Sequence, residues 1–163
     1  IMMKHTHLLF FICVCLIAVS VSCKSEAKTE TTEPVAATPA PPKYPALGNE
    51  AIGTLYSQAD KVDIIFYDLP ISVNQDNPAS VKNTVLYVSP AAPNITGNCK
   101  PLGRLTWMQQ GTILREADVY CDTGCEYLLF MQDNKPLAAN AMGPAGVAFF
   151  KNIISQVEKQ KQQ

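Results

Sequence analysis

Three cysteines, Cys99, Cys121 and Cys125, are the residues of this chain whose type and spacing could support chemistry. Thiols can form a disulfide in an oxidising compartment, exchange with another disulfide, or bind a soft metal ion. We expect one disulfide and interpret the remaining thiol as buried and inert. Disulfide exchange and a three-thiolate metal site are the alternatives. Cys-x3-Cys is not a zinc-knuckle spacing and no fourth ligand is evident, so we predict no metal site and no cofactor.

Carboxylates are the second set of reactive side chains. Glu116, Asp118 and Glu126 are predicted on one polar sheet face, where paired carboxylates could do acid–base work or bind calcium. A solvated sheet face explains them equally well, and we favour that interpretation. His5 and His7 are the only histidines, and both precede the predicted domain. Histidine-dependent catalysis is therefore excluded from the domain. We name no catalytic residue and regard a non-enzymatic role as the better hypothesis.

Three turn signals divide the segment that carries these side chains. They are Gln109-Gln110-Gly111, Asp122-Thr123-Gly124 and Asp133-Asn134-Lys135. A three-residue loop with glycine last suits a hairpin with a bulge. That loop length predicts a meander in which Arg104 lies opposite Glu116 as a cross-strand charge pair.

The same register predicts the positions of the three cysteines. Cys99 is placed opposite Cys121, and Cys121 opposite Cys125, in a row across three strands. Either neighbouring pair can form a disulfide. Cys99 and Cys125 would be separated by two strand spacings, about 9–10 Å, which is too far for a bridge unless the strand order differs from a meander.

The predicted register also divides the remaining side chains between two faces. Tyr120, Leu128 and Phe130 share the mainly polar face, and we predict this patch as the place for a partner or ligand. Arg115 interrupts the apolar face, and we expect it at the rim with its stem buried and its charge in water. The predicted core face comprises Leu105, Trp107, Ile113, Val119, Tyr127, Leu129, Met131, Leu137 and Ala139.

The other elements complete an α+β fold. The patterns predict a helix over residues 50–59, a strand over 62–69, a helix start at Asp76-Asn77-Pro78, and a last helix opened by Gly143-Pro144. We therefore expect one domain, residues 44–158, with an antiparallel meander sheet of four to five strands and helices packed on one face. A polar tail, 159–163, follows.

The residues before the domain resemble the start of a bacterial lipoprotein. Lys4 precedes the apolar run Leu8–Val21, which ends at Ser22-Cys23. The resemblance implies a signal peptide over 1–22, lipidation of Cys23, and a disordered Pro/Thr/Glu-rich tether that extends to residue 43. It also implies an exported protein held on a membrane by its lipid anchor. Lys24 favours the outer membrane, with the domain facing the periplasm or the cell surface.

Charge narrows the possible partners of the domain. Residues 44–158 hold seven Lys+Arg and eleven Asp+Glu, so the domain is acidic and lacks the basic footprint that nucleic acid requires. The function that we expect is a binding or interaction module of the cell envelope, with an envelope protein or a small ligand as its partner. The alternative is a thiol-dependent redox or metal-binding protein that uses the cysteine row.

Overall fold

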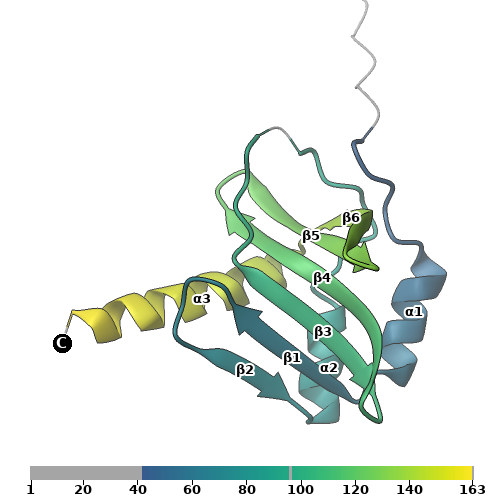
Figure 1. Cartoon of the computed structure of the whole chain (residues 1–163), viewed down its shortest axis with the longest axis horizontal. Coiled ribbons are helices and arrows are strands. Elements are labelled where there is room, and N and C mark those ends of the chain that lie inside the picture. Colours follow the sequence, from purple (N-terminus) through teal and green to yellow (C-terminus); the bar gives the residue numbers. More distant parts are fainter. Residues whose placement is uncertain (1–41, 96, 163) are drawn as a thin grey trace, which may run out of the picture. The chain divides into compact units, whose positions relative to one another are not determined.

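The computed structural model describes residues 42–95 and 97–162, which form an α+β fold (Figure 1). One antiparallel sheet has the strand order β2-β1-β3-β4-β5-β6. The predicted fold class and meander are confirmed, with six strands because β2 was not predicted. The elements in chain order are α1 (Asn49–Gln58), β1 (Lys61–Phe66), β2 (Ser72–Gln75), α2 (Pro78–Val85), β3 (Gly103–Gln109), β4 (Thr112–Asp122), β5 (Cys125–Gln132), β6 (Lys135–Ala141) and α3 (Pro144–Lys161).

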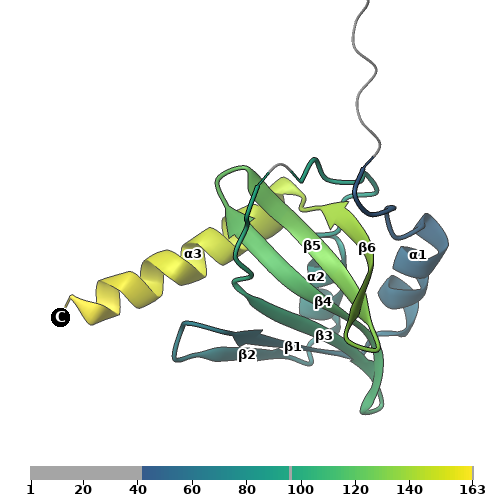
Figure 2. The same ribbon diagram turned by 45° about the horizontal axis from the view of Figure 1, so that its top comes forward.

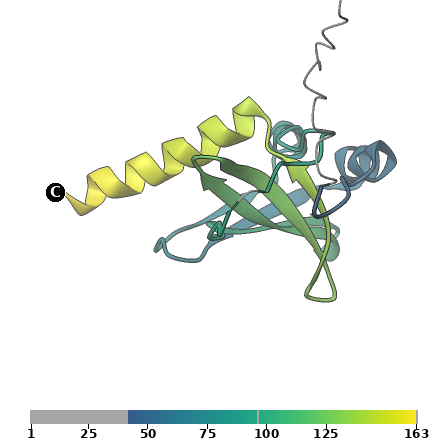
Figure 3. The same cartoon turned by 90° about the horizontal axis from the view of Figure 1, so that it is seen from above.

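All three helices contribute to one hydrophobic core against the sheet. Seen from above, α2 and α3 lie on one side of the strands (Figure 3). Their buried side chains, with Leu55 of α1, join strand residues that alternate along β1, β3, β4 and β5. We call this the covered face of the sheet. Its fully buried large side chains include Trp107, Phe130, Phe150, Ile64, Leu105 and Leu128.

Local signals account for where the helices begin and end. The Asn77 side chain accepts hydrogen bonds from the Ala79 and Ser80 backbone N–H groups, and Pro78 follows as the first helical residue, as predicted. Gly143 precedes Pro144 at the start of α3, also as predicted. That helix runs on to Lys161, so it includes most of the segment predicted as a tail.

The hairpin loops are one residue shorter than predicted. Gln109 pairs with Thr112 and Asp122 pairs with Cys125, so each turn has two residues. Gln110 and Gly111 both have positive φ, which suits a two-residue hairpin turn. In the β4–β5 pair this moves every partner by one residue, and a one-residue slip exchanges the faces of a strand. Leu128 therefore faces the core, where Tyr127 was predicted.

Other segments of the chain cover the β6 edge of the sheet. The β6 edge is covered because the Ala139 N–H donates to Pro45 and the Ala141 N–H donates to Ala91. The segment after α2 therefore runs along β6 before it crosses to the other face of the sheet, and Figure 2 shows this crossing near the ends of β4 and β5. The buried Asn140 side chain holds the edge together through hydrogen bonds with Leu47 and Ser89.

Candidate functional site

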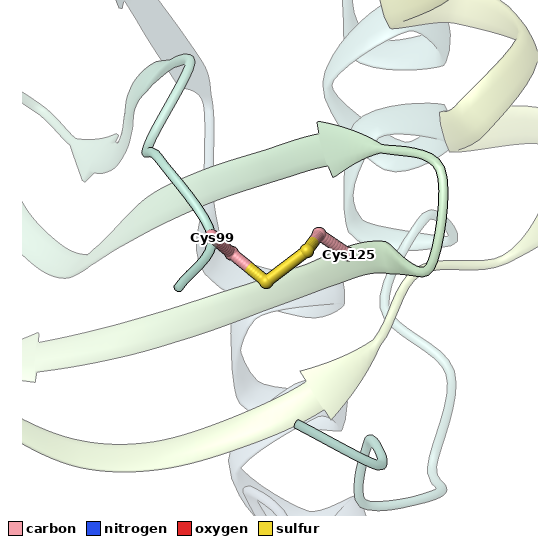
Figure 4. The surroundings of a disulfide bond; sticks show 2 residues. All are labelled: Cys99 and Cys125. Atoms are coloured by element: carbon pink, nitrogen blue, oxygen red, sulfur yellow. A yellow bond between two sulfur atoms is a disulfide. The ribbon is translucent and has the colours of Figure 1, made fainter. Parts of the chain in front are cut away.

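Cys99 and Cys125 form a disulfide, which corrects the predicted pairing (Figure 4). Their Cα atoms are 5.9 Å apart. The prediction treated Cys99 as part of a strand beside Cys121. Cys99 instead precedes β3 in the loop that lies on the open face, the sheet face opposite the helices, so no strand separates it from Cys125. The bridge ties this loop to the first residue of β5.

Cys121 is the free cysteine among the described residues, and it lies on the other side of the sheet. It belongs to the core, and its Sγ is 3.9 Å from the Val147 carbonyl oxygen of α3. Burial raises the pKa of the Cys121 thiol. A protonated thiol is a poor nucleophile, and the sheet separates it from the disulfide. The three cysteines thus do not form the predicted row.

The predicted patch of Tyr120, Leu128 and Phe130 is wrong. Leu128 and Phe130 are 0% exposed on the covered face, where Phe130 stacks on Trp107. Tyr120 alone lies on the open face, and it stacks on Tyr127 with ring centroids 4.3 Å apart. The cause is the turn between β4 and β5, which is one residue shorter than predicted. The register therefore places Leu128 and Phe130 on the covered face.

The open-face carboxylates form ion pairs. The Arg104 Nε donates to Asp118 Oδ1 at 2.8 Å, and the Tyr67 hydroxyl donates to the same oxygen at 2.8 Å. Glu116, the predicted partner of Arg104, lies 4.0 Å away on the diagonal. Glu126 was predicted on this polar face, but it lies on the covered face, where it pairs with Lys151 of α3. Within the described ranges, no group of three or more Cys, Asp or Glu side chains could hold a metal ion.

The most site-like feature was not predicted. A surface hollow of about 420 Å³ lies between α1 and β4, and we call it the α1 cavity. This volume is within the range of small-molecule pockets. Its walls come from the first two turns of α1 and from two consecutive residues of β4. The lining residues are Gly48, Glu50, Ala51, Thr54, Leu55, Leu114 and Arg115.

A β-bulge explains why two consecutive strand residues line one cavity. Successive side chains of a regular strand point to opposite faces. The pairing of β3 with β4 shifts between Trp107 and Met108, so that Leu114 has no partner in the ladder. A bulge of this kind bends the strand and changes the direction of side chains. Leu114 and Arg115 therefore reach the same space.

Two charged side chains line the α1 cavity, the exposed Glu50 and the half-buried Arg115. Neither the Glu50 carboxylate nor the Arg115 guanidinium forms an ion pair or hydrogen bond with residues 42–95 or 97–162. The two groups line one cavity without pairing with each other. Trp107, which pairs with Arg115 across the ladder, has a buried indole N–H that lacks an acceptor among those residues. The sequence signal was Arg115, a charge within an apolar pattern.

Comparisons with known proteins identify no relative: no protein-family model matches this sequence, and searches of curated proteins and of solved structures find no significant match. Among the helices that the structure describes, none is long and apolar enough to cross a membrane. Cys23 and the predicted signal peptide lie outside the described residues.

Proposed function

We propose that this protein is a lipid-anchored binding module of the cell envelope that takes a small ligand in the α1 cavity. The anchor would be Cys23, and the segment that extends to residue 43 would hold the domain away from the membrane surface. The single observation that carries the binding role is a pocket whose two charged lining groups lack partners in the described structure. A pocket that combines apolar side chains with a few polar groups is typical of small-molecule sites.

The sequence and the disulfide support the envelope location. The basic start, the short apolar run and Cys23 follow the order found in lipoproteins. A Cys99–Cys125 bridge suits an oxidising compartment outside the cytoplasm. A thiol-dependent role is less well supported, because Cys121 is buried on the face opposite that bridge.

The charges of the open face argue for the α1 cavity as the site. Arg104, Asp118 and Tyr67 bind one another on that face, as do Lys61 and Asp63. A ligand there would have to replace contacts that already exist. Glu50 and Arg115 present no such competition within the described structure.

Membrane fractionation tests the anchor. Cys23→Ala in the full chain should move the protein from the membrane fraction to the soluble fraction, because the acceptor of the lipid is lost. Cys121→Ala is the matched control and should leave fractionation unchanged. If the Cys23 variant remains in membranes, the lipid anchor is wrong.

Filling the α1 cavity tests the binding role. Thr54 is exposed and lines the cavity, so Thr54→Phe should occupy the space at little cost to the core. Gln58→Phe, on the same helix but not in the lining, is the control. The probes are octanoate, hexylamine, cyclohexanol and L-leucine, followed by ligand-observed NMR. We expect at least one probe to bind the wild type and the control, and to bind Thr54→Phe at least tenfold more weakly. Equal binding to all three proteins, or to none, would overturn the role of the cavity.

A further inference from the structure

We infer that the α1 cavity is built for a small zwitterion with an apolar body, a molecule that carries one ammonium and one carboxylate. This inference rests on the proposed binding role and names the class of ligand. It depends on the arrangement of charge across the cavity. The walls contribute one group of each sign, Glu50 from α1 and Arg115 from β4, with apolar side chains beside them.

The two charges are complementary to such a ligand in sign. A guanidinium binds a carboxylate through paired N–H donors, and a carboxylate accepts from an ammonium. Glu50 and Arg115 are more than the 4.0 Å of an ion pair apart, although they line one space. A ligand of a single charge would satisfy one group and meet a like charge at the other. A zwitterion satisfies both.

The rest of the lining sets the chemistry of the ligand body. Ala51, Leu55 and Leu114 are apolar, so a hydrocarbon side chain gains from burial against them. The cavity, at about 420 Å³, has room for one amino-acid-sized molecule or a very short peptide. Free amino acids and peptides share the required ammonium and carboxylate, and they differ in how far apart these groups lie.

Ligands with one end blocked carry only one of the two charges and keep the same apolar body, so they test each charge on its own. L-Leucine carries both charges, L-leucinamide keeps only the ammonium, and N-acetyl-L-leucine keeps only the carboxylate. L-Leucyl-L-leucine holds both charges further apart. Binding to the purified protein is measured by calorimetry and by the fluorescence of Trp107, the one tryptophan of the chain and the ladder partner of Arg115.

We expect leucine or its dipeptide to bind at least tenfold more tightly than both blocked forms. The tighter of these two identifies an amino acid or a peptide as the source. Arg115→Gln and Glu50→Gln should each weaken that binding about tenfold, which corresponds to about 1.4 kcal/mol. Glu158→Gln and Lys159→Gln, near the end of α3, each remove one charge, of opposite sign, outside the lining and should leave binding unchanged.

Two results would contradict the inference, and they differ in what they leave standing. Equal binding of leucine and both blocked forms, lost in Thr54→Phe, would overturn the zwitterion and keep the cavity as a binding site. Binding of none of the four compounds, together with no binding of the uncharged and singly charged probes, would overturn the proposed function itself. Unchanged leucine affinity in Arg115→Gln and Glu50→Gln would also overturn the assignment of these two residues.

Discussion

The two faces of the sheet are held by different means. The covered face packs against three helices, and its core is a continuous set of fully buried side chains. The open face has a smaller apolar cluster, in which Tyr127, Leu129 and Ala139 are buried beneath a loop. The disulfide belongs to this second cluster, because Cys99 and Cys125 pack against it. Burial against the helices therefore stabilises the covered face, whereas the Cys99–Cys125 disulfide holds the loop that lies over the open face.

The same comparison separates charges that are paired from charges that are not. Arg104 and Asp118 pair on the open face, where Asp118 is the most buried partner with a 13% exposed side chain. Glu50 and Arg115 lack partners in the described structure, at the border of the covered face. Arg104 and Asp118 already satisfy each other, whereas Glu50 and Arg115 have no partner among the described residues.

The largest expected effect is a loss of stability from a substitution on the covered face. Phe130→Ala removes a fully buried ring that stacks on Trp107, and we expect a loss of about 3–5 kcal/mol in the free energy of unfolding. Tyr120→Ala removes a partly buried ring on the open face and should cost less than half as much. Urea denaturation of both variants gives the difference. Equal losses would mean that the two faces do not differ as described.

The next effect concerns the cross-link of the open face. Cys99→Ser/Cys125→Ser removes a bridge between residues 26 positions apart, and we expect a loss of about 2–4 kcal/mol. Hydrogen exchange should show that β5 loses protection before the helices do. A uniform loss of protection across the domain would contradict the interpretation that the disulfide acts locally, on the loop over the open face.

Two glycines provide a smaller and more selective test of the covered face. A Cβ at Gly146 of α3 would lie 2.7 Å from the Tyr87 Cβ, so Gly146→Ala should cost about 1–3 kcal/mol. A Cβ at Gly53 of α1 would meet nothing within 4 Å, so Gly53→Ala should stabilise by up to about 1 kcal/mol. Thermal unfolding measures both. If the two substitutions had the same sign, the close contact of α3 with Tyr87 would be wrong.

The effect with the narrowest range is a pH dependence, confined to alkaline solution, that arises on the open face. Burial raises the pKa of Tyr127 from 10.0 to about 12. The unfolded tyrosine loses its proton near pH 10, so the stabilising contribution of Tyr127 is complete below pH 10 and is lost as the pH approaches 12. Absorbance at 295 nm should show a tyrosine that ionises near pH 12, and Tyr127→Phe should remove it. Ionisation of all tyrosines near pH 10 would show that Tyr127 is not buried.

The sequence predicted the fold well where local signals were strong. Asn77-Pro78 and Gly143-Pro144 marked two helix starts correctly, because capping and proline act locally. The hairpins were found, but their loop length was not, since a glycine at the end of a loop suits either two or three residues. That ambiguity alone moved Leu128 and Phe130 to the wrong face.

The candidate site was less predictable for a physical reason. Its walls come from α1 and β4, which are far apart in the chain, and a bulge at Leu114 has no sequence signature of its own. Arg115 stood out within an apolar pattern, and the predicted rim position agrees with its half-buried side chain. Nothing in the sequence related it to Glu50. The pairing of Cys99 with Cys125 was not predicted either, because it depends on the path of the loop that carries Cys99.

An amide chemical-shift map of the protein with saturating L-leucine tests the central claim, that binding occurs at the α1 cavity and not on the open face. The account predicts that the largest shifts cluster at residues 48–55 and 114–115, with a change in the Trp107 indole N–H signal. Shifts centred on Tyr120, Tyr127 and Asp118, with residues 48–55 unchanged, would contradict it.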